Sequence, residues 1–189
     1  MKLLKVALLA AVVLAALLLI AGLCMPAEWT VERSIVVRGE PAAVHALVGN
    51  LEKWPKWMPW IAEDPAMKFS FAGTAGAPGS SLTWKSAKLG DGALTVISSD
   101  LASGLRYDLA MAQLDAPAHG SITYVETQRV EGAPAFGAAS KATRVTWKDT
   151  GRLGSNPLAR LMGPVVESML GMHFDRGLMN VKSLVEGGT

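Results

Sequence analysis

The sequence of 189 residues is poor in the side chains that most often carry catalysis or bind metals. Cys24 is the only cysteine, so no disulfide can form within the chain. The histidines His45, His119 and His173 are scattered, and no HExxH motif, cysteine pair or His-x-His motif accompanies them. The sequence therefore gives no reason to expect a bound metal.

Motifs of the common enzyme classes are also missing. There is no G-x-S-x-G nucleophile elbow, P-loop or dinucleotide-binding fingerprint, which argues against hydrolase, NTPase and dehydrogenase functions. These absences weigh less against a cyclase, whose catalysis can rest on cavity shape and one acid or base. The 18 basic and 16 acidic residues nearly balance, and no Lys/Arg cluster is interleaved with aromatic residues. We therefore expect no nucleic-acid partner, and no cofactor is indicated.

One long apolar run stands at the beginning of the chain. Residues 6–24 carry no charge, and at about 1.5 Å per residue the run can cross a hydrocarbon core of roughly 30 Å. No clean A-x-A cleavage site follows it. We therefore expect residues 1–28 to form an uncleaved signal anchor, with a transmembrane helix over about residues 4–24. Signal cleavage and secretion of the remaining domain is the alternative.

The flanking charges predict the orientation of this span. Lys2 and Lys5 precede the run, whereas the first charged residue after it is Glu28. The positive-inside rule then places the N-terminus in the cytoplasm and the domain on the extracytoplasmic side, which is the periplasm in a Gram-negative bacterium. Trp29 suits the aromatic belt at the membrane interface.

Residues 29–189 are expected to form one domain of strand, helix, six strands and a long helix. A β-rich segment at 30–38 precedes a helical pattern at 39–54. The six strands, separated by Gly/Pro/Ala-rich breaks, are predicted at residues 68–72, 80–87, 92–99, 105–112, 120–130 and 142–149. The final helix covers 156–187, where Pro164 should kink or restart it. Its expected apolar positions are Leu158, Leu161, Met162, Val165, Met169, Phe174, Val181 and Leu184.

Short strands in sequence joined by short loops predict an antiparallel sheet, because parallel neighbours need long crossovers. One such sheet with a long helix on one face is an α+β arrangement. The strands alternate apolar and polar residues, as expected of a sheet with one buried face.

The order of elements resembles that of the SRPBCC superfamily, which includes START domains, the birch-pollen allergen and polyketide cyclase/dehydrase-like proteins. The segments that carry the resemblance are VERSIVVRGEPAAVHALVGNLEKWPKWMPW, SSLTWKS, TRVTWK and HFDRGLMNVKSLVE, and it covers about residues 30–187. The resemblance implies a helix-grip fold, in which a curved antiparallel sheet of about seven strands grips the C-terminal helix. It also implies a cavity between sheet and helix for an apolar or amphipathic small molecule.

Four aromatic residues from four predicted strands share the buried parity: Trp84, Tyr107, Tyr124 and Trp147. They pack a dry core or line the cavity, and either place suits large rings with few polar atoms. Met169 and His173 are four residues apart on one stripe of the last helix, towards the sheet. His173 can contact a ligand oxygen from there, or lie at the helix border with one nitrogen in solvent.

The stretch LEKWPKWMPW at 51–60 contains three of the six tryptophans. Pro55 and Pro59 prevent a regular α-helix, and the remaining conformations, a 3₁₀ turn or polyproline II, repeat every three residues. Trp54, Trp57 and Trp60 should therefore lie on one edge. Trp54 is expected in the core, and Trp57 and Trp60 either in the core or at the cavity mouth, with a membrane-facing position as a third alternative.

The first functional hypothesis is a membrane-anchored domain that binds a lipid-like hydrophobic or amphipathic molecule. Its ligand-binding residues would be Trp57, Trp60, Trp84, Tyr107, Tyr124, Trp147, Met169 and His173. The second is a polyketide cyclase/dehydrase-like enzyme that uses His173 or a cavity tyrosine as the acid or base. The third is an interaction or stress-response domain with a vestigial cavity, smaller than the roughly 300 Å³ of typical ligand pockets.

Overall fold

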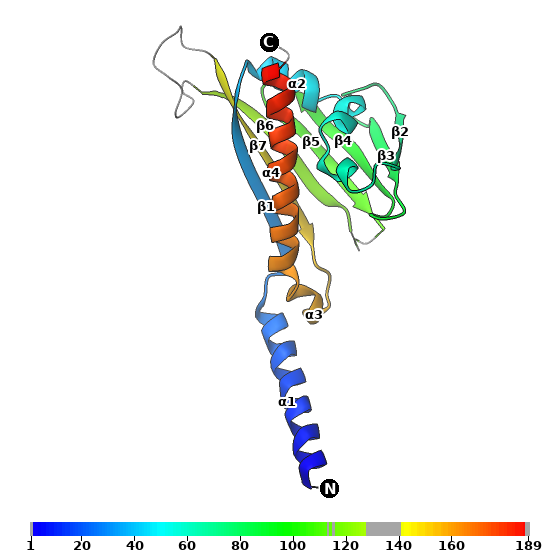
Figure 1. Ribbon diagram of the computed structural model, residues 1–189, viewed down its shortest axis with the longest axis vertical. Helices are drawn as coiled ribbons and strands as arrows, with labels where there is room; N and C mark the ends of the chain where they lie inside the picture. The colour runs from blue at the N-terminus through cyan, green and yellow to red at the C-terminus, as the bar shows by residue number, and fades with distance from the viewer. Residues whose placement is uncertain (1, 113, 115, 128–140, 188–189) are drawn as a thin grey trace.

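The computed structural model describes residues 2–112, 114, 116–127 and 141–187. Helix α1 extends away from the rest of the chain, and the long helix α4 crosses one face of a sheet (Figure 1). The elements are α1 (Lys2–Cys24), β1 (Glu28–Arg38), α2 (Pro41–Val48), the 3₁₀ helices η1 (Leu51–Lys56) and η2 (Pro59–Ala62), β2 (Lys68–Ala72), β3 (Ser81–Lys85), β4 (Gly92–Asp100), β5 (Gly104–Met111), β6 (Ala118–Thr127), β7 (Ala142–Arg152), α3 (Pro157–Arg160) and α4 (Gly163–Gly187).

All seven strands form one antiparallel sheet in the order β1-β7-β6-β5-β4-β3-β2. Strands β2 to β7 follow one another as neighbours, and β1 pairs with β7 along its whole length, from Glu28 opposite Arg152 to Arg38 opposite Ala142. The connection from β1 to the far edge strand β2 carries α2, η1 and η2. The predicted α+β helix-grip fold is confirmed.

The predicted helix over 39–54 divides into two pieces. Helix α2 ends at Val48, where the N–H of Gly49 donates to the carbonyl of His45 at 2.8 Å. The side chain of Asn50 then accepts a hydrogen bond from the N–H of Glu52 and caps η1. The two prolines exclude an α-helix as expected, and the segment adopts 3₁₀ turns.

The C-terminal helix also begins in two pieces. α3 ends at Arg160 and α4 begins at Gly163, so that Pro164 occupies the first turn of a new helix, as the sequence predicted. Phe174, Leu178 and Val181 form the buried stripe of α4, at the spacing of three and four residues that one helix face requires. Several expected apolar positions are instead exposed, namely Leu158, Met162, Val165, Met169 and Leu184.

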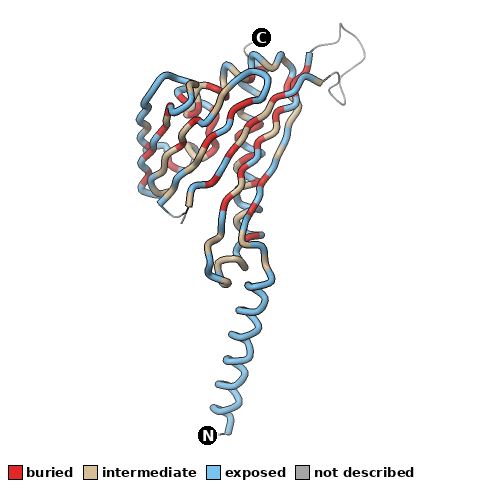
Figure 2. The backbone as a smooth tube through the Cα atoms, turned by 180° about the vertical axis from the view of Figure 1, so that it is seen from behind, coloured by how far each residue is buried: buried red, intermediate tan, exposed pale blue. Residues whose placement is uncertain are grey.

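Helix α1 is the one helix of the described chain that is long and apolar enough to cross a membrane. Its residues are coloured as exposed along its length in Figure 2, and Gly22 is its only buried residue. At Gly22 the helix meets α3, where an added Cβ would lie 2.1 Å from the carbonyl oxygen of Pro157. The base of α1 is therefore fixed against α3, while the core of the domain consists of residues from Trp29 onward.

Candidate ligand-binding cavity

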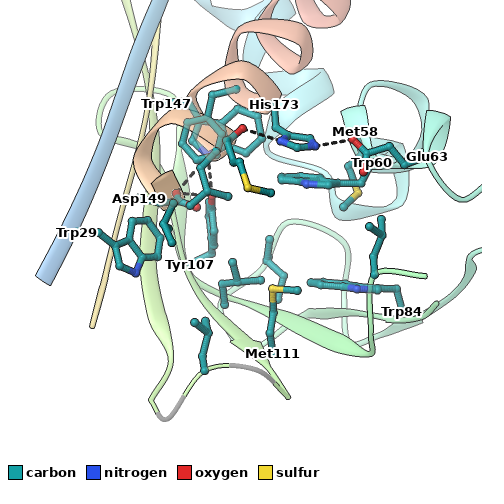
Figure 3. Close-up of a pocket in the computed structure, with 18 of the residues that line it drawn as sticks. Trp29, Met58, Trp60, Glu63, Trp84, Tyr107, Met111, Trp147, Asp149 and His173 are labelled. Atoms are coloured by element: carbon teal, nitrogen blue, oxygen red, sulfur yellow. Dashed lines mark hydrogen bonds and ion pairs between the residues drawn. The ribbon is translucent and has the colours of Figure 1, made fainter. Parts of the chain in front are cut away.

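A cavity of about 540 Å³ lies between the sheet, the η1–η2 segment and the first turns of α4. Five of the six tryptophans line it: Trp29, Trp54, Trp60, Trp84 and Trp147. Tyr107 lines it as well and lies near Trp29 and Trp147 in Figure 3. Five of the nine methionines line it as well: Met58, Met67, Met111, Met162 and Met169. Rigid aromatic rings and adaptable thioethers make a wall suited to an apolar ligand without fixing its shape closely.

Glycines on neighbouring strands make room for the large rings. Three cross-strand pairs place an aromatic residue directly opposite a glycine: Trp29 with Gly151, Trp84 with Gly92, and Tyr107 with Gly120. A Cβ added at Gly120 would lie 2.1 Å from the ring of Tyr107, well inside van der Waals contact. Each ring therefore lies flat over the backbone of the next strand instead of filling the cavity.

The three tryptophans of the WPKWMPW segment gather around Trp147. Their ring centroids lie 6.3 Å (Trp54), 5.3 Å (Trp57) and 6.0 Å (Trp60) from that of Trp147. The three rings therefore converge on Trp147, although only Trp54 and Trp60 line the cavity. Trp147 in turn stacks on Phe174 of α4 at 4.0 Å, which joins the segment, the sheet and the helix in one aromatic cluster.

Asp149 on β7 is the buried charged group of this wall. It is 4% exposed and follows Trp147 with the same inward parity. The hydroxyl of Tyr107 donates to its Oδ1 at 2.7 Å, and the Nε1–H of Trp147 contacts both that hydroxyl at 2.7 Å and Oδ1 at 3.2 Å. Burial raises the pKa of Asp149 to about 7, despite these two hydrogen bonds. Burial also raises the pKa of Tyr107 well above its ordinary value, so Tyr107 remains a hydrogen-bond donor.

His173 on α4 also lines the cavity. Its Nε2 is 2.6 Å from Oε1 of Glu63 and its Nδ1 is 2.7 Å from the carbonyl oxygen of Met169. Both ring nitrogens of His173 therefore have a partner, one on α4 itself and one in the Glu63 carboxyl group. Trp60 stacks on the ring with a centroid distance of 5.7 Å. The pair joins α4 to the turn after η2 at the cavity rim.

Of the eight residues predicted to bind a ligand, six line the cavity: Trp60, Trp84, Tyr107, Trp147, Met169 and His173. Trp57 does not, because it is buried behind Trp54 and Trp147, where Asn180 donates to its carbonyl oxygen at 3.0 Å. Tyr124 also lies outside the lining. Ligand binding by these residues stays a prediction.

Tyr124 has a different set of partners at the α2 end of the sheet. Its hydroxyl donates to the carbonyl oxygen of Asp100 at 3.1 Å and contacts Nδ1 of His45. Because the single hydroxyl proton goes to Asp100, His45 is the donor in the second contact. Burial raises the pKa of Tyr124 to about 12. Tyr124 thus ties α2 to the β4–β5 turn.

Trp29 and Asp149 are two of the cavity residues that the sequence interpretation did not nominate. The placement of Trp29 in an aromatic belt is wrong, because Trp29 is 4% exposed and its ring lies in the cavity wall against Gly151. Asp149 was not singled out, although it continues the inward parity of Val145 and Trp147. That parity was the available signal for Asp149.

Within the described ranges, no group of three or more His, Cys, Asp or Glu side chains could hold a metal ion. The lining instead combines apolar side chains with one buried carboxyl group and the pair Glu63–His173. Such an arrangement can hold an apolar body and orient one polar group of a bound molecule.

Solved structures with the same architecture share little sequence with this chain. The protein XoxI from Bacillus cereus matches with a TM-score of 0.58 and 14% identity over 83% of this chain and 95% of that one. The Aha1 dimer from Colwellia psychrerythraea matches with a TM-score of 0.56 and 13% identity, covering 85% of this chain and 98% of that one. The di-domain ARO/CYC StfQ of the steffimycin biosynthetic pathway matches with a TM-score of 0.59 and 12% identity, over 85% of this chain and 51% of that one.

These likenesses, at such low identity, establish the helix-grip fold alone. No curated protein matches the sequence. Residues 28–186 match the family described as polyketide cyclase/dehydrase and lipid transport, so the chain belongs to that family of the SRPBCC superfamily.

Proposed function

We propose that the protein is a membrane-anchored helix-grip domain that binds a lipid-like hydrophobic or amphipathic small molecule in its cavity. The observation that carries this proposal is the cavity itself. Its volume of about 540 Å³ exceeds the roughly 300 Å³ at the lower end of small-molecule sites, and its wall is mainly aromatic and aliphatic. This volume argues against the third hypothesis, a vestigial cavity.

The anchor is helix α1. Its 23 residues extend about 35 Å at the helical rise of about 1.5 Å per residue, which is enough for a bilayer core. Lys2 and Lys5 at its start favour a cytoplasmic N-terminus and a domain on the extracytoplasmic side. Its apolar side chains are exposed to solvent unless lipid covers them, which supports a span more than a packed core helix.

The position of α1 would bring the cavity close to the bilayer. The last turn of α1 contacts α3. Met162 and Met169, which follow α3 in the chain, line the cavity and are exposed, so they lie at its rim. Leu158 and Val165, with exposed fractions of 48% and 46%, extend this apolar surface. A ligand leaving lipid could therefore enter the cavity without crossing bulk water.

Native mass spectrometry of the protein tests the proposal. The anchor-deleted protein, which lacks residues 2–25, keeps every residue of the hydrophobic core and should carry or acquire a bound apolar molecule. Met111→Trp places a large ring in the cavity wall and should reduce the bound fraction. Met179→Trp is the matched control, because Met179 lies on α4 with 61% exposure and outside the cavity lining. Equal, low occupancy in all three proteins would contradict the proposal.

The second candidate is an enzyme of the cyclase/dehydrase kind, and the polar groups of the cavity are the observation that favours it. His173 has acceptors at both ring nitrogens and Tyr107 already donates to Asp149, so neither nominated residue has a free nitrogen or proton. A carboxyl group with a pKa of about 7 is the better acid or base at neutral pH. If turnover of a polyketide-like substrate is detected, His173→Ala should leave it largely unchanged and Asp149→Asn should abolish it.

A further inference from the structure

Asp149 is a buried acid without a cation. No lysine, arginine or histidine of the described residues forms an ion pair with it, whereas the ion pairs that do occur lie elsewhere on the protein. Its side chain is 4% exposed and borders the cavity. A carboxylate in that position loses several kcal/mol of hydration, and two hydrogen bonds to Oδ1 replace only part of it.

The other charged groups of the cavity do not supply a positive charge next to Asp149. Glu63 and His173 are paired with each other, and neither forms a hydrogen bond or an ion pair with Asp149. Arg152 lines the rim, but it is exposed and has the opposite parity on β7 from Asp149. Tyr107 on β5 is the titratable group in direct contact, and it is neutral.

The hydrogen bonds of Asp149 leave one oxygen for a ligand. Tyr107 and Trp147 both donate to Oδ1, and no described residue donates to Oδ2. Figure 3 shows Asp149 among Trp29, Tyr107 and Trp147. The wall therefore positions one carboxylate oxygen and leaves the second without a donor.

We propose that Asp149 recognises a protonated amine on an otherwise apolar ligand, so that the cavity takes cationic amphiphiles. The inference rests on the proposed function, because it requires that the cavity hold a ligand. An ammonium group supplies both the missing donor and the missing positive charge, and such charge-assisted hydrogen bonds are roughly twice as strong as neutral ones. Aromatic rings beside Asp149 add cation–π attraction. A hydroxyl group supplies only the donor, and a carboxylate is repelled.

Proton release accompanies this recognition. Burial holds the pKa of Asp149 at about 7, so about half of the molecules carry the proton at neutral pH. A bound ammonium stabilises the ionised form and expels that proton. Affinity for the amine therefore rises as pH increases from below to above the pKa of Asp149, as long as the amine stays protonated.

The test compares hexylamine, hexanol and hexanoate as probes on the full chain in phosphatidylcholine nanodiscs, with empty discs to subtract partitioning into lipid. Quenching of tryptophan fluorescence reports binding, because five tryptophans line the cavity. We expect hexylamine to bind about tenfold or more tighter than hexanol, the typical effect of a hydrogen bond to a charged group. Hexanoate should bind weakest.

Asp149→Asn keeps the acceptor for Tyr107 and Trp147 but removes the charge, and it should reduce the amine preference to about threefold or less. Asp108→Asn is the matched control, because Asp108 lies on β5 outside the cavity lining and pairs with exposed His119. It should retain the full preference. Calorimetry of the wild-type chain in two buffers of different ionisation enthalpy should show release of about half a proton per amine at pH 7.

The outcomes separate this inference from the function on which it rests. Equal binding of amine and alcohol to the wild-type chain, or an amine preference that survives in Asp149→Asn, overturns the role of Asp149 and leaves the cavity function intact. Absence of proton release on amine binding to the wild-type chain also overturns the role of Asp149, even where the Asp149→Asn variant does not fold. No binding of any probe overturns the proposed function as well.

Discussion

Replacing Asp149 by Asn should change how the stability of the domain depends on pH. The pKa of this carboxyl is raised from 3.8 in the unfolded chain to about 7 in the folded protein, because burial disfavours the ionised form. Between these values the folded state keeps a proton that the unfolded state has lost. Stability therefore falls as pH rises through this window, and the favourable contribution is gone above pH 7.

The expected size follows from the pKa difference. Each pH unit well inside the window changes the free energy of unfolding by about 1.4 kcal/mol, and the slope falls to half of this at the folded-state pKa, so the two units from pH 5 to pH 7 correspond to about 2 kcal/mol. Asp149→Asn has no proton to lose there. The variant should match the wild-type protein within about 1 kcal/mol at pH 5 and exceed it in stability by about 2 to 3 kcal/mol at pH 8.

Urea unfolding of the anchor-deleted protein, followed by tryptophan fluorescence at pH 5, 6, 7 and 8, measures this difference. Other acidic residues do not produce the same difference in stability between the two proteins. Hydrogen bonds from Ser86 and Ser103 lower the pKa values of Asp64 and Asp100, so these groups act on stability at more acidic pH and equally in both proteins. Parallel pH profiles for the two proteins would refute the reasoning that Asp149 is buried without a compensating charge.

Two further substitutions test the wall and the rim of the cavity. Gly120→Ala places a Cβ 2.1 Å from the ring of Tyr107 and should lower the free energy of unfolding by about 2 kcal/mol in urea titrations. At the control position Gly187 a Cβ meets nothing within 4 Å, so Gly187→Ala should change this free energy by less than about 0.5 kcal/mol. Equal effects of the two substitutions would disprove the close contact. Val165→Asp should reduce flotation of the anchor-deleted protein with phosphatidylcholine vesicles. Val125→Asp, at a residue 62% exposed on β6, should not; unchanged flotation of Val165→Asp would contradict a membrane-facing rim.

The order of elements was predictable because short-range chemistry decides it here. Prolines and glycines mark the breaks, and period-two alternation identifies each strand, so the predicted boundaries of β2 agree with the structure and those of β3, β4 and β5 differ by at most two residues. β7 was predicted to end at Asp149 but continues to Arg152. Residues 150–152 of β7 pair with β1, which lies more than 100 residues earlier in the sequence. A local sequence pattern does not identify so distant a partner.

The candidate site was predictable in its aromatic part and not in its polar part. Trp84, Tyr107 and Trp147 were identified by inward parity and do line the cavity. Tyr124 has the same parity, yet it lies outside the lining, because parity gives the face of the sheet and not the position along it. Asp149 was missed because a charged residue at a strand end normally marks the point where the strand leaves the core. The hydrogen bonds that keep it inside come from β5 and from Trp147.

A crystal structure of the purified protein tests the central claim most directly, because it shows what occupies the cavity. The account predicts continuous density for an elongated molecule between Trp84 and Asp149, with its polar end at the carboxyl group. A cavity that contains only ordered water, or one whose walls have closed on each other, would contradict it.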